Sequence, residues 1–334
     1  MIMQLDCALY QHPKLITVFG GSGFVGRHVV EALTKRGYRV RIAVRSPQKA
    51  YYMLQIGEVG QTQMLRTDIK CRASVARALL GSDGAVFLPG SLAQANQPNF
   101  QKTQIEGAQN VSELTAEAGI PLIYMSALVA NKNASFLYAR VKSMSEEIIH
   151  NEHPQAIIMR PSIIFGPEDC FFNNLANLSC FLPIIPLFGG GQSKLQPVYV
   201  GDVAEFIVRA LEGQVISGKS YDLGGPQIIT FQNVLEYILK IIHRKKTILS
   251  MPLSAGLFIG GLLGTIGKLP LAPTLVTASQ IRFLQIDNIV SQEAIENGYT
   301  LEGVGITPKA MAALLPSYLW RFRPHGQFSR NLPA

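Results

Sequence analysis

The sequence predicts an α/β fold: a doubly wound parallel sheet with a smaller, mostly C-terminal domain. Short apolar runs alternate with amphipathic stretches over residues 1–166. This alternation is typical of parallel strands joined by right-handed helical crossovers. Beyond residue 166 the chain becomes rich in Phe, Leu, Pro and Gly. We therefore expect a sheet domain over 1–166, joined by a returning helix over 198–213, and a smaller domain from 167–197 and 214–334.

Composition indicates a folded chain with anionic partners. Of the 334 residues, 48% are hydrophobic and 16% are charged, and the formal net charge is +8. The basic residues are scattered and form no stripe with interleaved aromatics, so we expect no nucleic-acid partner. The four cysteines, Cys7, Cys71, Cys170 and Cys180, have no metal-ligand spacing, and the histidines form no cluster. Reduced thiols and no metal site are the expectation.

The first strand and the turn after it carry the main signal. An apolar run over 15–19 leads into Gly20-x-x-Gly23-x-x-Gly26, and a helical pattern follows. This order predicts a Rossmann-type strand, a tight turn and a helix N-terminus whose free N–H groups can hold a pyrophosphate. Glycines permit the turn, the close approach of the ligand and the packing of helix on strand. The predicted dinucleotide contacts are Gly20, Gly21, Ser22, Gly23, Phe24, Val25 and Gly26.

The second strand, over 39–44, ends in a residue that bears on cofactor choice. Sites that prefer NAD usually carry Asp or Glu near this position, to bind the ribose 2′-hydroxyl. This chain has Arg45 there and no acidic residue nearby. A guanidinium pairs with a 2′-phosphate in bidentate fashion, so NADP(H) is the preferred cofactor and NAD(H) the alternative. The other interpretation of Arg45 is a solvated side chain at a strand end.

Two further strands add candidate contacts. A third strand over 64–68 ends at Asp68, followed by Ile69. Asp68 either accepts a hydrogen bond from the adenine amino group or caps the next helix, over 74–80, and the two roles are compatible. A fourth strand begins at Gly84 and runs into a turn of Leu88, Pro89 and Gly90 near the expected cofactor crevice.

Candidate catalytic groups follow a helix over 101–118 and a fifth strand over 121–125. Ser126 closes that strand, and Tyr138 and Lys142 lie four residues apart on one helix face. An ammonium near a phenol lowers the phenol pKa, which suits Tyr138 to proton transfer. Ser126 would hydrogen-bond a substrate oxygen, and Lys142 would also bind the nicotinamide ribose. The alternative is a chance pattern on a solvated helix face.

Together these motifs resemble the short-chain dehydrogenases/reductases of the extended or atypical type. The resemblance covers nearly the whole chain and implies that Pro161 and Ile163 also contact the cofactor. It is carried by residues 19–26, Ser126, Tyr138, Lys142, 160–167, 197–204 and 221–226.

A narrower resemblance is to the dehydrogenase-like accessory subunits of respiratory complex I and their bacterial relatives. Residues 20–27, 171–173, 189–191 and 316–324 carry it. It implies a tightly held NADPH, complex I subunits as partners, and a role in assembly or stability without established turnover.

Two departures from the wider family weaken the case for catalysis and spare cofactor binding. Active members usually have an Asn in the helix after the fourth strand, where this chain has Gln104. The longer side chain would displace the water relay that such an Asn supports. Leu88-Pro89-Gly90 also replaces the turn that is usual there. An active NADP-dependent reductase, dehydrogenase or epimerase on an alcohol or carbonyl remains the alternative, and no substrate follows from the sequence.

The region after residue 166 suggests a substrate loop and a partner surface. We expect residues 171–191 to form a loop over the cofactor. A helix over 230–242 ends in the basic run 243–246, and residues 247–267 carry no charge. Gly256, Gly260 and Gly264 recur every four residues there, which permits close helix packing. A buried helix is one interpretation; we favour a hydrophobic partner surface together with an interfacial element that turns the basic run toward anionic lipid.

These features also predict a location. The first 14 residues lack the basic and long apolar regions of a signal peptide. We therefore expect a cytoplasmic protein, bound peripherally to the cytoplasmic face of the inner membrane.

Overall fold

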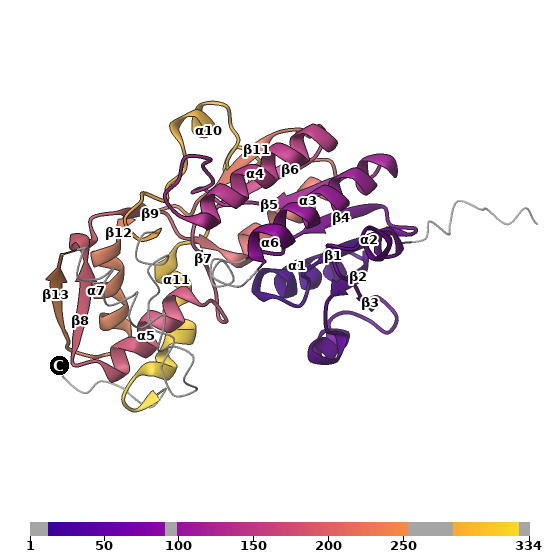
Figure 1. Cartoon of the computed structure of the whole chain (residues 1–334). Helices are drawn as coiled ribbons and strands as arrows, with labels where there is room; N and C mark the ends of the chain where they lie inside the picture. Colours follow the sequence, from indigo (N-terminus) through magenta and orange to yellow (C-terminus); the bar gives the residue numbers. More distant parts are fainter. Residues whose placement is uncertain (1–12, 91–98, 253–282, 327–334) are drawn as a thin grey trace, which may run out of the picture.

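The computed structural model describes residues 13–90, 99–252 and 283–326, and these form two lobes (Figure 1). The larger lobe contains a parallel seven-stranded sheet with the order β11-β6-β5-β4-β1-β2-β3. The predicted α/β, doubly wound fold is therefore confirmed. The strands are β1 (Leu15–Phe19), β2 (Arg39–Val44), β3 (Thr62–Arg66), β4 (Gly84–Phe87), β5 (Leu122–Met125), β6 (Ile157–Pro161) and β11 (Ser220–Leu223).

The order of the strands reverses at β1, which lies between β2 and β4. Val18 pairs with Ile42 on one side and with Val86 on the other, and all three are fully buried. Continuous apolar strands of this kind are stable only when helices cover both faces of the sheet. Folds of this kind bind ligands beyond the carboxyl ends of the strands at such a reversal.

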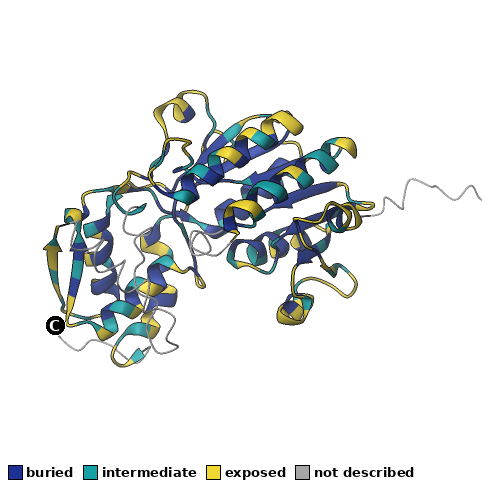
Figure 2. Cartoon of the chain, viewed as in Figure 1, coloured by how far each residue is buried: buried dark blue, intermediate teal, exposed yellow. Residues whose placement is uncertain are grey.

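Helices cover both faces, and their buried sides appear dark blue in Figure 2. One face packs against α1 (Phe24–Lys35) and α6 (Val200–Leu211), which also contact each other. The other face packs against α2 (Arg72–Leu79), α3 (Phe100–Glu117) and α4 (Leu137–Glu152). A short 3₁₀ segment, η2 (Pro47–Gln55), follows β2.

The smaller lobe has its own core around Phe172, Ile238 and Leu315. Its helices are α5 (Phe171–Phe181), α7 (Phe231–Ile241) and α11 (Met311–Leu319). Three two-stranded sheets accompany them. They are β7 (Ile164–Phe165) with β10 (Val198–Tyr199), β8 (Ile184–Phe188) with β13 (Thr247–Met251), and β9 (Lys194–Leu195) with β12 (Ile229–Thr230). The remaining short elements are η4 (Gly189–Gly191), α10 (Gln292–Glu296) and η5 (Trp320–Phe322).

The boundary between the lobes differs from the predicted one. Strand β11, within the segment assigned to the smaller domain, pairs with β6 as an edge strand of the large sheet. Leu301 and Ile306 also pack in the core of the larger lobe. The chain therefore returns to the sheet more than once after residue 213.

Two expectations for the smaller domain are corrected by its secondary structure. Residues 171–191 do not form a loop over the cofactor; they form helix α5, strand β8 and the turn η4, because their apolar side chains fill the core of the smaller lobe. Thr247–Met251 is the strand β13, paired in parallel with β8. The rest of the uncharged segment, with Gly256, Gly260 and Gly264, lies outside the described residues, as does the N-terminal stretch 1–12 with Cys7.

Among the described helices, none combines the length and the apolar character that crossing a membrane requires. The three cysteines within the described ranges, Cys71, Cys170 and Cys180, are free thiols, as predicted.

Candidate functional site

The glycine turn joins β1 to α1 in a conformation that requires glycine at two positions. Gly20 has a φ of +76°, and its carbonyl accepts a hydrogen bond of 3.0 Å from the Gly23 N–H. A Cβ on Gly26 would lie 2.5 Å from the Gly20 carbonyl oxygen, so only glycine lets the helix start this close to the turn. The first turn of α1 carries no acidic side chain. Its N–H groups and dipole therefore favour an anion such as a pyrophosphate.

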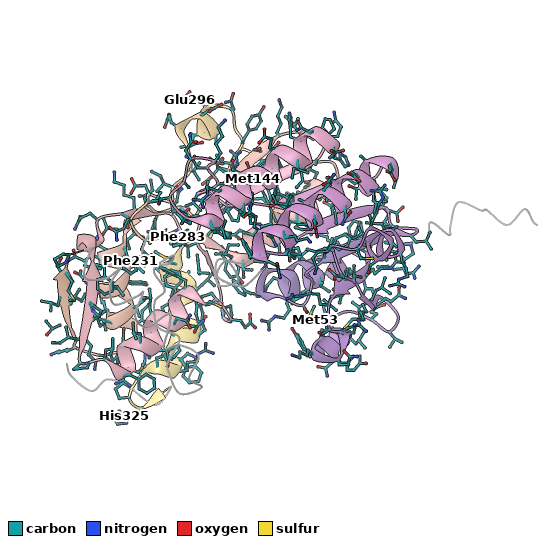
Figure 3. The ribbon with its side chains drawn as sticks, viewed as in Figure 1. Met53, Met144, Phe231, Phe283, Glu296 and His325 are labelled. Carbon is teal, nitrogen blue, oxygen red and sulfur yellow. The ribbon has the colours of Figure 1, made fainter. Side chains whose placement is uncertain are left out.

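Tyr52 and Arg27, which were not among the predicted site residues, lie beside this turn. Tyr52 is on η2, the segment that also carries Met53 (Figure 3), and its hydroxyl donates to the Ser22 carbonyl at 2.8 Å. The Arg27 guanidinium lies 5.8 Å from the centroid of the Tyr52 ring, and its buried Nε has no hydrogen-bond partner among the described residues. A basic residue directly after the third glycine was the available signal for Arg27. No signal in the sequence identified Tyr52.

The ends of β2 and β3 hold the two residues predicted at the adenosine side. Arg45 is exposed directly after β2. Asp68 is exposed after β3, but it does not cap the next helix. That helix begins at Arg72 with Cys71 as its N-cap, and the Asp68 carboxylate accepts from the Lys70 N–H at 3.1 Å. The capping interpretation is therefore wrong, because a local turn satisfies Asp68. Ile69 is buried against α3, where a Cβ on Gly107 would lie 2.7 Å from its side chain.

The turn after β4 brings the glycine turn and α3 together. Pro89 lies against Gly20, since a Cβ on Gly20 would be 3.3 Å from the Pro89 nitrogen. Gly90 has a φ of +108°, and the Gln104 carboxamide occupies the space where its side chain would be. Gln104 is buried, and its Oε1 has no hydrogen-bond partner among the described residues. Leu88 is buried beside them.

Lys142 is the centre of the nicotinamide end of the site. It is fully buried on α4. Its ammonium donates to the Met125 carbonyl at 2.7 Å and lies 3.5 Å from both the Pro89 carbonyl and the Tyr124 hydroxyl. These contacts join the ends of β4 and β5. Ser126, the next residue after β5, is buried, and its Oγ is unpartnered within the described part of the chain.

The predicted effect of Lys142 on Tyr138 is wrong. Burial raises the pKa of Tyr138 well above the ordinary value for a phenol. Burial also lowers the pKa of Lys142 to about 7, and the nearby Glu146 carboxylate opposes this shift. The lysine donates to carbonyl groups, so its charge does not offset the desolvation of the phenol. Tyr138 instead stacks on Phe100, with ring centroids 6.3 Å apart.

Glu146 and Arg160 link this helix to β6, a pair that the sequence did not reveal. The Arg160 Nε and Nη2 donate to the two carboxylate oxygens of Glu146 at 2.9 and 2.6 Å. Arg160 is followed directly by Pro161, and both Pro161 and Ile163 are buried at the end of β6. The helical spacing could have indicated Glu146, because this residue follows Lys142 by one helical turn.

A dinucleotide fits this arrangement at both ends. At the glycine turn Gly20, Gly21 and Gly23 carry no side chain that would cover the backbone, and at the other end the Ser126 Oγ and Gln104 Oε1 have no partner among the described residues. Residues 20–26 would hold the pyrophosphate, and Ser126, Tyr138 and Lys142 would lie at the nicotinamide end. When bound, the cofactor supplies a hydride donor or acceptor. Over the described ranges, no group of three or more His, Cys, Asp or Glu side chains is arranged to bind a metal ion.

Comparison with curated proteins finds relatives along most of the chain. It is 29% identical over 340 residues to NADH dehydrogenase (ubiquinone) 1 alpha subcomplex subunit 9, mitochondrial, of Mus musculus, which covers 98% of this chain and 88% of the mouse protein. The protein of the same name from Arabidopsis thaliana is 28% identical, over 93% of this chain and 78% of the plant protein. These relatives confirm the narrower resemblance.

Solved structures and a family model agree with the fold. UDP-glucose 4-epimerase of Thermus thermophilus in complex with NAD matches with a TM-score of 0.61 at 18% identity, covering 91% of this chain and 98% of the epimerase. A family model described as NAD dependent epimerase/dehydratase family matches residues 16–224, from β1 through β11. Because this match spans more than half of the chain, the chain belongs to the NAD dependent epimerase/dehydratase family.

Proposed function

We propose that this chain is an NADP(H)-binding accessory or assembly component of respiratory complex I, with little or no turnover. The observation that carries the proposal is the contrast within the site. A glycine turn and a helix N-terminus suited to a pyrophosphate lie at one end, and at the other Tyr138 is buried and stacked on Phe100, with its pKa raised by burial. The mouse and Arabidopsis relatives are named as subunits of NADH dehydrogenase, which supports the choice of partner.

The preference for the phosphorylated cofactor rests on the residue after β2. Arg45 is exposed there and has no ion-pair partner among the described residues. An unpaired guanidinium at that strand end is suited to a 2′-phosphate. The family model is described as NAD dependent, so NAD(H) is the alternative ligand that a binding experiment must include.

Peripheral contact with an anionic membrane surface is part of the same proposal. The run His243–Lys246 supplies positive charge after α7, and Phe181, Ile184 and Leu249 are exposed apolar side chains of the same lobe. Cations near exposed apolar groups favour the surface of an anionic bilayer. We accordingly propose a location on the cytoplasmic face of the inner membrane.

The test begins with protein purified without added nucleotide. We expect bound NADPH, identified by chromatography of the released nucleotide, and no oxidation of that NADPH across a broad panel of carbonyl compounds. Deletion of the gene is expected to reduce the assembled amount and activity of complex I. Normal complex I in the deletion strain would overturn the accessory role.

A second candidate is an active NADP-dependent oxidoreductase or epimerase. The buried, unpartnered Ser126 hydroxyl next to a Tyr and Lys pair favours it, since such a group would hydrogen-bond a substrate oxygen. A relative from Caulobacter vibrioides that is 26% identical over 194 residues is named ceramide reductase. Steady NADPH consumption with a carbonyl compound, abolished by Tyr138→Phe, would establish this alternative.

A further inference from the structure

An open cavity of about 790 Å³ lies in the smaller lobe, between α7 and the paired strands β8 and β13. Phe231, at the start of α7, is labelled in this lobe in Figure 3. Residues from α7, from β8 and from the segment 244–250 line the cavity, and none belongs to the glycine turn or to the Ser126 end. It is therefore separate from the proposed dinucleotide site.

One end of the cavity is strongly positive. Arg244, Lys245 and Lys246 line it where the chain passes from α7 into β13. The Arg244 Nε donates to the Phe322 carbonyl at 3.2 Å, and its two Nη groups have no hydrogen bond to a described residue. Within the described ranges, no Asp or Glu forms an ion pair with any of the three. This end thus has uncompensated charge for an anion.

The cavity is also lined by one acidic residue, Glu236 on α7. Glu236 accepts a hydrogen bond from Gln232 at 2.9 Å, one turn earlier on α7. Among the described residues, its carboxylate forms no ion pair with Arg244, Lys245 or Lys246.

The floor of the cavity is apolar. Leu187 on β8 and Leu239 on α7 are buried there, and Ile248 on β13 is half-buried. Because Leu187 and Leu239 are already buried, the apolar surface left for a ligand to cover belongs mainly to Ile248. Hydrocarbon that covers exposed apolar surface is stabilised by roughly 25 cal/mol per Å². A small inorganic anion would leave this floor uncovered.

From this combination we infer that the cavity binds one molecule of an anionic phospholipid. The phosphate lies against Arg244, Lys245 and Lys246, and part of an acyl chain covers the floor formed by Leu187, Leu239 and Ile248. Charge complementarity selects the headgroup, and the apolar floor selects an amphiphile over a free phosphate. The inference goes beyond the proposed function, because general attraction to a membrane requires the charge but no cavity, and it stands without the dinucleotide.

The test measures binding by calorimetry, using the full chain with its cofactor. The probes are dihexanoyl phosphatidylglycerol below its critical micelle concentration, dihexanoyl phosphatidylcholine and inorganic phosphate. We expect phosphatidylglycerol to bind at least about tenfold more tightly than either of the others. The double substitution Lys245→Gln and Lys246→Gln is expected to weaken this binding by about tenfold or more. Lys219→Gln, an exposed lysine on the other lobe, is the matched control.

A substitution in the apolar floor distinguishes binding of the acyl chain from binding of the phosphate. Ile248→Ser is expected to weaken phosphatidylglycerol binding and leave the response to phosphate unchanged. Equal affinity for phosphate and phosphatidylglycerol would overturn the lipid assignment in favour of a free-phosphate site. Equal losses in the double variant and in Lys219→Gln would overturn the site itself. Retained cofactor and an unchanged thermal transition show that each variant is folded. If the double variant does not fold, the single variant Lys245→Gln is tested in its place.

Discussion

The pyrophosphate end and the nicotinamide end of the site differ in the groups that face a ligand. At the proposed pyrophosphate end, backbone N–H groups at the start of α1 would supply the contacts, and the side chains in the turn are small or absent. At the proposed nicotinamide end, Ser126, Tyr138 and Lys142 would supply the contacts, and all three side chains are buried. The first end depends on backbone shape, and the second depends on the ionisation of side chains.

Under the proposed function, this difference accounts for cofactor binding without turnover. Backbone N–H groups and a helix dipole keep the same charge distribution at every pH, so a site of this kind attracts an anion over the whole pH range. A phenol and an ammonium lose their ionised forms when they are removed from water. The same packing that holds the Rossmann lobe together therefore opposes proton transfer at Tyr138.

The largest loss of nucleotide affinity is expected from blocking the pyrophosphate end of the site. Gly23→Val places a side chain where the pyrophosphate approaches, while a Cβ there meets only the Gly20 carbonyl, at 3.3 Å, and Gly23 has an ordinary φ of −75°. We expect a loss of NADPH and NADH binding of at least about a thousandfold, or roughly 4 kcal/mol. Calorimetry measures the affinity, and thermal unfolding without nucleotide is the control for the fold. Undiminished binding would show that the cofactor lies elsewhere.

Lys142 is expected to make stability depend on pH. Its pKa is about 7 in the folded chain and 10.5 as a model value, so the unfolded state binds the additional proton between these values. Unfolding free energy therefore rises with pH across this window, and the penalty is largest below pH 7. From pH 7 to 9, we expect the wild type to gain about 2–3 kcal/mol relative to Lys142→Met. Denaturant titrations at both pH values measure this difference in unfolding free energy. Parallel pH profiles for the two proteins would contradict the prediction.

Arg45→Ala tests the specificity of the adenosine side. Losing a charge-assisted contact with the 2′-phosphate is expected to weaken NADPH binding by about 1.5–3 kcal/mol, which is about ten- to more than a hundredfold. NADH binding is expected to change little, because NADH lacks that phosphate. Arg66→Ala, at the end of the neighbouring strand β3, is the matched control. Equal losses for both nucleotides would remove Arg45 as the specificity residue.

The smallest effect is expected from Tyr138→Phe. The Tyr138 hydroxyl makes no hydrogen bond to a described residue, and phenylalanine keeps the stacking on Phe100. The change in unfolding free energy is expected to stay within about 0.5 kcal/mol, and NADPH affinity within about threefold. Complementation of the deletion strain by this variant is the decisive measurement. Failure of the variant to restore complex I would argue that the hydroxyl acts in the cell.

Features that depend on neighbours in the chain were predictable from the sequence. The strand, glycine turn and helix at residues 15–35 follow from local hydrophobic period and from the special freedom of glycine. The alternation that continues through β5 determines the parallel order and brings Gly20, Arg45, Leu88 and Ser126 to one edge of the sheet. The resemblance to the extended dehydrogenases rests on the same local motifs.

Features that depend on burial and on contacts between distant parts of the chain were not predictable from the sequence. The pKa of Tyr138 was predicted from a helical spacing, but its direction depends on desolvation by Phe100 and other residues far away in the chain. Tyr52 reaches the Ser22 carbonyl across thirty residues, and no periodicity signals such a bond. Strand β11 joins β6 only because the chain returns from the smaller lobe, which a boundary drawn from composition cannot show.

The late return of the chain to the large sheet has a consequence during synthesis. Leu301 and Ile306 complete a core that begins with Ile16 and Val18, and β11 supplies the outer strand beside β6. A nascent chain that has emerged only as far as α6 therefore exposes the open edge of β6 and an unfinished apolar face, both of which favour aggregation. The larger lobe can complete its core only after residue 306 has emerged from the ribosome.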